Sequence, residues 1–118
     1  LATSDDATDW FAILDLYDQL RRVAPSPVVE LNRAVAVAQV EGLFPALQAL
    51  DAIDDPKLSD YHLLHATRAD VLRRLGEREE AAEALRLAVR SAPTAPERRY
   101  LERRLAELVA EGAVGGDG

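Results

Sequence analysis

The chain has 118 residues, of which 48% are hydrophobic, and its 14 basic and 21 acidic residues leave a formal net charge of −7. This length and apolar content predict one domain with a continuous core. The negative charge repels phosphate backbones, so we expect no nucleic-acid binding by this piece alone. Because the chain has no cysteine, disulfides, thiolate catalysis and thiolate zinc sites are excluded.

No segment has the pattern of a signal peptide, and none approaches the roughly 18 unbroken apolar residues of a membrane span. We therefore expect a cytoplasmic domain without a membrane partner. The chain begins at Leu1 and contains no Met, which indicates a piece of a longer protein. Residues 8–111 are the predicted folded domain. We expect disordered tails at residues 1–7 and at the glycine-rich residues 112–118.

Apolar residues recur at helical spacing through six segments, and no segment alternates like a strand. The predicted helices cover residues 9–24, 27–40, 43–53, 60–75, 77–91 and about 95–110. The signals that start helices are the N-cap candidates Thr8, Ser26, Ser59 and Thr94, the last with Glu97 at capping-box spacing. The signals that end helices are Pro25, Gly42, Asp54-Asp55-Pro56, Gly76 and Pro93.

A weak repeat organises these helices. Gly42 and Gly76 are 34 residues apart, and Pro25 and Pro93 are 68 apart, which is twice the same period. A period of 34 residues is that of tetratricopeptide repeats. The best unit, residues 62–95, has small or apolar residues where its two helices must approach closely, namely Ala69, Gly76, Ala81, Leu85 and Ala88.

The predicted fold class is therefore all-α, a tetratricopeptide-like α–α superhelix of about six antiparallel helices. The chain would open in the second helix of a truncated unit and close with a cap helix. The middle unit departs from the pattern, because Leu47 and Asp54 stand where small residues are expected. A generic helical bundle stays open as the alternative topology.

No motif for catalysis or cofactor binding is present, so we expect neither an enzyme nor a cofactor. His62 and His65 lie three residues apart on a predicted helix, with Asp60 and Asp70 nearby, and could hold a metal ion. The pattern lacks a His-Glu-x-x-His motif and a calcium loop, so we interpret these histidines as packing or interface residues. No metal site is predicted.

In tetratricopeptide domains the first helix of each unit lines a concave groove. The repeat frame, together with the motifs described below, gives these candidate partner-binding residues: Asn32, Arg33, Gln39, His62, His65, Arg68, Asp70, Arg73, Arg74, Tyr100 and Arg104. Asn32 and Arg33 interrupt the apolar helix of residues 28–40, where burial without a partner would be costly. Either Arg33 pairs with a carboxylate of an adjacent helix and Asn32 caps a loop, or both contact a ligand or partner.

Three segments carry a resemblance to a known family: residues 24–37 with APSP and LNRAVAV, residues 61–76 with YHLLHATRADVLRRLG, and residues 97–105 with ERRYLERRL. In this order they resemble the C-terminal part of those bacterial extracytoplasmic-function (sigma-70 family) RNA polymerase sigma factors that carry a tetratricopeptide extension. The resemblance covers residues 8–108. It implies upstream helical domains, absent from this chain, that bind RNA polymerase core and read promoter DNA.

The function implied by this resemblance is that of a regulatory or interaction domain in transcription initiation. Its partners would be the sigma domains of its own chain or RNA polymerase, with promoter DNA contacted only through the upstream domains. Two alternatives stay open. One is a free-standing peptide-binding scaffold, and the other is a helical domain that senses a small molecule.

Overall fold

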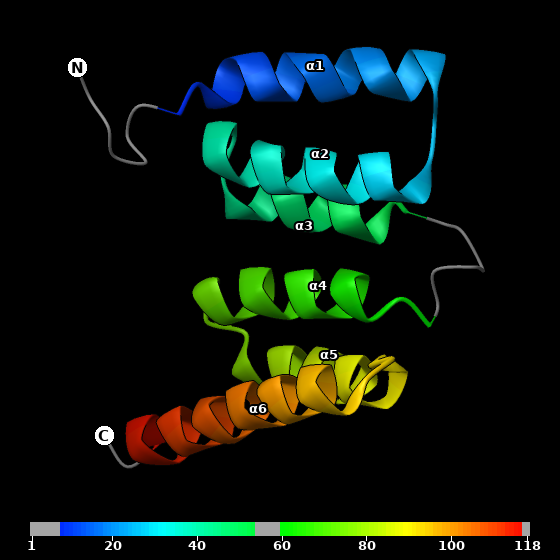
Figure 1. The fold of residues 1–118 in the computed structure, drawn as a ribbon. Coiled ribbons are helices and arrows are strands. Elements are labelled where there is room, and N and C mark those ends of the chain that lie inside the picture. The colour runs from blue at the N-terminus through cyan, green and yellow to red at the C-terminus, as the bar shows by residue number, and fades with distance from the viewer. Residues whose placement is uncertain (1–7, 54–59, 117–118) are drawn as a thin grey trace. The chain divides into compact units, whose positions relative to one another are not determined.

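The computed structural model describes residues 8–53 and 60–116, and every regular element in these ranges is an α-helix (Figure 1). The predicted all-α class is confirmed. The helices are α1 (Trp10–Val23), α2 (Pro27–Val40), α3 (Leu43–Asp51), α4 (His62–Arg74), α5 (Arg78–Ser91) and α6 (Ala95–Gly116). The predicted tail of residues 1–7, the stop at Asp54-Asp55-Pro56 and the cap Ser59 lie outside the described residues.

The helices form two compact units, Leu1–Ile53 and Asp54–Gly118. The single folded domain of residues 8–111 stays a prediction. In the first unit α2 packs against both α1 and α3, and in the second unit α5 packs against both α4 and α6. Each helix thus packs mainly on its neighbours in sequence. This is the contact pattern of a helical repeat, in which short connections join successive antiparallel helices.

Two predicted N-caps start their helices as expected. Ser26 Oγ accepts a hydrogen bond of 3.1 Å from the Val29 backbone N–H, and Pro27 follows it as the first residue of α2. Thr94 Oγ1 accepts a hydrogen bond of 3.2 Å from the Glu97 N–H at the start of α6. Both hydroxyls satisfy backbone donors that the first turn of a helix leaves unpaired.

The cap of α1 is Asp9 and not the predicted Thr8. The Asp9 carboxylate accepts a hydrogen bond of 3.0 Å from the Ala12 N–H. A carboxylate at this position also interacts favourably with the positive end of the helix dipole, which a hydroxyl does less strongly. Both residues were compatible with a cap, and the negative charge favours Asp9.

Other helix boundaries differ from the predicted ones. Helix α3 ends at Asp51 instead of residue 53, and α4 begins at His62 because Tyr61 has an extended backbone. Helix α6 continues to Gly116, beyond the predicted end near residue 110 and into the segment expected to be a disordered tail. Gly112 keeps a right-handed helical backbone, and glycine lowers helix propensity without interrupting the hydrogen-bond ladder. Residues 117 and 118 lie outside the described residues.

Two glycines have the positive φ that ends a helix. Gly42 follows α2 with φ 109°, and Gly76 follows α4 with φ 87°. At the end of α4, the Gly76 N–H donates to the Arg73 carbonyl at 3.0 Å and the Glu77 N–H donates to the Leu72 carbonyl at 2.9 Å. These two bonds form a Schellman motif, which satisfies carbonyl groups at the C-terminus of the helix.

Replacing either glycine with alanine is expected to destabilise the chain, because a Cβ disfavours positive φ whether or not space is available. The loss in unfolding free energy should be about 1–2 kcal/mol for Gly76→Ala. It should be about 1–3 kcal/mol for Gly42→Ala, whose φ of 109° and ψ of 175° suit glycine alone. Gly112→Ala is the matched control, and its helical backbone predicts no loss. Urea unfolding followed by circular dichroism measures the unfolding free energy of all three variants. Equal losses in the three would contradict the positive φ assigned to Gly42 and Gly76.

The core of the first unit lies between α1, α2 and α3. Leu14, Ala36, Val37 and Ala46 are buried there, and Trp10 and other half-buried residues pack against them. Ala36 and Ala46 are each 0% exposed, and their small side chains let the helix backbones approach closely. Helix α1 is therefore held to the following helices by apolar packing.

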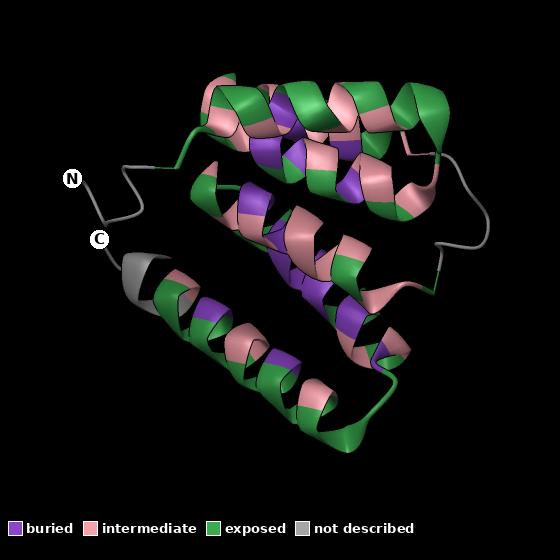
Figure 2. Cartoon of the chain, turned by 45° about the horizontal axis from the view of Figure 1, so that its top comes forward, coloured by how far each residue is buried: buried purple, intermediate pink, exposed green. Residues whose placement is uncertain are grey.

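The core of the second unit confirms the predicted small residues. Ala69 of α4 and both Ala81 and Ala88 of α5 are at most 2% exposed, and Leu72 at 1% is the largest fully buried side chain. By contrast, α6 carries few buried residues among mostly exposed ones, as Figure 2 shows. Its buried leucines Leu101 and Leu108 are seven residues apart and mark one apolar stripe.

Within the described ranges, no helix combines the length and the apolar character that crossing a membrane would require.

Candidate functional site

Helices α4 and α6 bring several of the candidate residues together in the second unit. Asp70 of α4 is contacted by Arg73 at 3.0 Å, by Arg74 at 3.7 Å and by Arg104 of α6 at 3.8 Å. We call Asp70, Arg73, Arg74, Arg104 and the adjoining Tyr100 the arginine cluster. Asp70 and Arg104 are 34 residues apart in sequence. This separation equals one repeat period, and the groove to which the repeat frame assigned both residues stays a prediction.

Tyr100 fixes one side of the arginine cluster. Its hydroxyl Oη accepts a hydrogen bond of 3.1 Å from Arg104 Nη1, one helical turn further along α6. This hydrogen bond is the main cause that raises the pKa of the Arg104 guanidinium above its usual value; burial opposes it, and charge interactions with Tyr100, Asp70 and Glu107 add to the increase. Arg104 therefore stays charged at every physiological pH. The guanidinium of Arg103 lies 5.9 Å from the centre of the Tyr100 ring, within cation–π distance.

The arginine cluster has more hydrogen-bond donors than internal acceptors. Of these three arginines, Arg73 donates a hydrogen bond of 3.0 Å to Asp70, whereas the contacts from Arg74 and Arg104 are longer than a hydrogen bond. The Arg73 Nε atom is inaccessible to solvent and has no hydrogen-bond partner among the described residues. Each guanidinium carries five N–H groups, so one carboxylate cannot satisfy three of them.

A second contact between α4 and α6 involves a predicted site residue. His62 Nε2 lies 3.0 Å from Glu97 Oε2, and the His62 side chain is 16% exposed. The distance allows an ion pair when His62 is protonated, and Glu97 Oε2 is buried without a hydrogen-bond partner among the described residues. Glu97 therefore directs its carboxylate toward α4. The Thr94 half of the predicted capping box forms, and the Glu97 side chain has a contact with His62 that the spacing alone did not predict.

Arg33, in the first unit, pairs with a carboxylate of an adjacent helix, which was one of the two predicted alternatives. Its Nε donates to Asp18 Oδ1 of α1 at 2.6 Å. Arg21 and Glu30 form a two-point ion pair between the same helices, with hydrogen bonds of 3.2 and 3.0 Å. These contacts join α1 to α2 and account for Arg33 without a ligand.

Asn32 is exposed on α2, so the expectation that it needs a partner to offset burial was wrong. The prediction assumed that an apolar helix is buried on all sides. In the structure Val28 and Val35 of the same helix are also exposed, at 50% and 38%. Gln39 is exposed as well. A groove that joins these residues of the first unit to the arginine cluster stays a prediction.

The remaining candidates, His65 and Arg68, are half-buried on α4. Across residues 8–53 and 60–116, no group of three or more His, Asp and Glu side chains is arranged to hold a metal ion.

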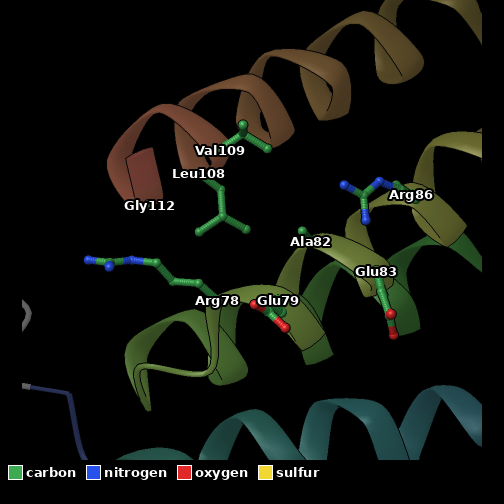
Figure 3. A pocket seen from close by; sticks show the side chains of 8 residues that line it. All are labelled: Arg78, Glu79, Ala82, Glu83, Arg86, Leu108, Val109 and Gly112. Atoms are coloured by element: carbon green, nitrogen blue, oxygen red, sulfur yellow. The ribbon is translucent and has the colours of Figure 1, made fainter. Parts of the chain in front are cut away.

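The structure also has a shallow hollow that the sequence did not predict, with a volume of about 350 Å³ between α5 and α6. In Figure 3, Leu108 points into this hollow above Ala82, whereas Glu83 points away from it. Arg78 and Arg86 lie at its two ends. Gly112 also lines this hollow and contributes no side chain to it; a Cβ added there would lie 3.6 Å from Arg78 Cδ. No sequence motif marks this hollow, because its lining depends on how α6 crosses α5.

Comparison with known proteins finds a relative but no family. The chain is 41% identical over 113 residues to an uncharacterized protein of Rhizobium meliloti (strain 1021). The match covers 96% of this chain and 26% of the relative, so the chain spans about a quarter of the relative's length. No family model matches the chain, and no solved structure matches it.

Proposed function

We propose that this chain is a protein-interaction domain that regulates a longer protein, and that the longer protein is an extracytoplasmic-function RNA polymerase sigma factor. The domain would act in transcription initiation by contacting the sigma domains of its own chain or RNA polymerase. The observation that carries this proposal is the arginine cluster, in which charged side chains from two helices converge on one surface without being satisfied internally.

Two further observations support the proposal. The sequence motifs around Asn32, Asp70 and Arg104 resemble those of sigma factors with a tetratricopeptide extension. In addition, the Rhizobium meliloti relative is much longer than this chain, which agrees with a domain that works as part of a larger polypeptide. The sequence of the full-length parent gene provides the first test, since the proposal requires sigma domains before Leu1.

The decisive experiment is run-off transcription with the full-length parent protein and its own promoter. Arg73→Ala should reduce the transcript severalfold, because truncating a desolvated arginine at an interface costs about 2 kcal/mol or more. Arg73 is partly exposed, so its loss should leave the fold intact, which thermal melting of the 118-residue chain checks.

The matched control is Arg90→Ala, which removes the same charge from an exposed position on α5. Equal transcription by wild type and Arg73→Ala, with equal melting temperatures, would contradict the role of the arginine cluster in transcription. A large loss of melting temperature in Arg73→Ala would instead assign this residue to the stability of the fold.

A further inference from the structure

The arginine cluster reverses the charge of the chain locally. Its three guanidinium groups face the carboxylate of Asp70, and Glu107 adds one more negative charge near Arg104, which still leaves an excess of positive charge at this place on a chain of net charge −7. At physiological ionic strength charges separated by more than about 8 Å are largely screened. A charged group that reaches this surface therefore interacts mainly with the arginines and much less with the distant carboxylates.

The three guanidinium groups of the arginine cluster are partly accessible, apart from the buried Nε of Arg73. The side chains of Arg73, Arg74 and Arg104 are 37%, 44% and 37% exposed. Nη2 of Arg73 donates a hydrogen bond to Asp70, and Nη1 of Arg104 donates one to Tyr100. The remaining N–H groups, apart from the buried Nε of Arg73, can bind planar anions in the two-point geometry that guanidinium groups form with carboxylates.

Apolar side chains lie on the same helix faces as these arginines. Leu63 precedes Asp70 by seven residues and Arg74 by eleven, which places all three on one face of α4. Leu63 is 46% exposed and Tyr100 of α6 is 50% exposed. A ligand bound by the arginines would therefore find apolar and aromatic contact surface beside its anionic groups, as a peptide with mixed acidic and apolar side chains requires.

We infer that the arginine cluster, with Leu63 and Tyr100 beside it, binds an acidic peptide segment in which glutamate or aspartate flanks an apolar side chain. In the unbound chain the Asp70 carboxylate partly occupies the site that a ligand carboxylate would take. This inference deepens the proposed function, on which its role in transcription rests, by naming the chemistry of the partner. A nucleic-acid ligand is disfavoured, because a long polyanion would also extend over the acidic remainder of the chain.

The test is fluorescence anisotropy with the 118-residue chain and a fluorescein-labelled peptide in which pairs of glutamates flank a phenylalanine. The comparison peptide has glutamine in place of each glutamate. The chain should bind the glutamate peptide and not the glutamine peptide. Arg104→Gln and Arg74→Gln should each weaken binding about tenfold or more, whereas the control Arg90→Gln, on exposed α5 surface, should bind as wild type does.

Asp70→Asn gives the result that separates a binding role from a structural one. Removing the internal carboxylate should raise the affinity for the glutamate peptide, whereas a purely structural ion pair predicts a lower melting temperature and no gain in affinity. The inference is overturned if neither wild type nor Asp70→Asn binds the glutamate peptide, or if the glutamine peptide binds equally well. It is also overturned if duplex DNA binds more tightly than the peptide and with the same dependence on Arg104.

These outcomes are separate from those of the proposed function. If the peptide binds but the parent gene encodes no sigma domains, the proposed function fails and the inference stands. If the parent protein depends on Arg73 in transcription but the chain binds no acidic peptide, the inference alone fails.

Discussion

A chain that starts at Pro25, without α1, is expected to aggregate or to lose the fold of its first unit. The deletion removes Leu14 from the buried core and Trp10 from its edge, and it uncovers Ala36 and Val37 of α2. Burying one large apolar side chain contributes about 1.5–3 kcal/mol. Since a whole domain is stable by only about 5–15 kcal/mol, the loss of several such residues together is sufficient to unfold it.

The deletion also removes both ion-pair connections between the helices, Asp18 with Arg33 and Arg21 with Glu30. The measurements are size-exclusion chromatography and thermal melting by circular dichroism. A chain that lacks only residues 1–7 is the matched control, because it keeps all of α1. A monomeric, cooperatively melting chain from Pro25 onward would contradict the role of α1 in completing the first unit.

Leu72→Ala is expected to be the most destabilising single truncation in the second unit. Leu72 is 1% exposed, on a helix that packs against α5, and Ala69 of α4 and Ala81 of α5 are buried as well. Removing a fully buried leucine side chain costs about 2–5 kcal/mol, because it loses apolar burial and leaves a cavity between close-packed helices. Urea unfolding followed by circular dichroism measures the change.

Leu63→Ala is the control for this prediction. Leu63 lies on the same helix but is 46% exposed, so its truncation should change the unfolding free energy by less than about 1 kcal/mol. Similar effects for Leu63→Ala and Leu72→Ala would show that the burial assigned to α4 is incorrect.

Sequence reasoning was most reliable where a structural signal is local. Ser26-Pro27, Gly42 and Gly76 mark helix ends through their own side chains or backbone preferences, and each lies where it was predicted. The 34-residue period assigned Asp70 and Arg104 to one predicted groove, and the two side chains lie 3.8 Å apart.

Other features depend on how helices are rotated and aligned against each other, which the sequence pattern does not determine. The partner of Arg33 is Asp18 only because of the alignment of α1 with α2. The exposure of Asn32 follows from the rotation of α2, which leaves Val35 exposed as well. The contact of Glu97 with His62 depends on the placement of α6 beside α4. A single sequence contains the residues for these contacts but no direct signal for the pairing.

The position of Trp10 gives the chain a built-in optical reporter. Trp10 is the only tryptophan of the chain, and it is half-buried against the core that α1 and α2 share. Its emission wavelength depends on whether water reaches the indole ring, so it reports the folding of the first unit without any label. Far-ultraviolet circular dichroism, in contrast, reports helices of both units. Recording the two signals in one titration therefore distinguishes a change in the first unit from a change in the second.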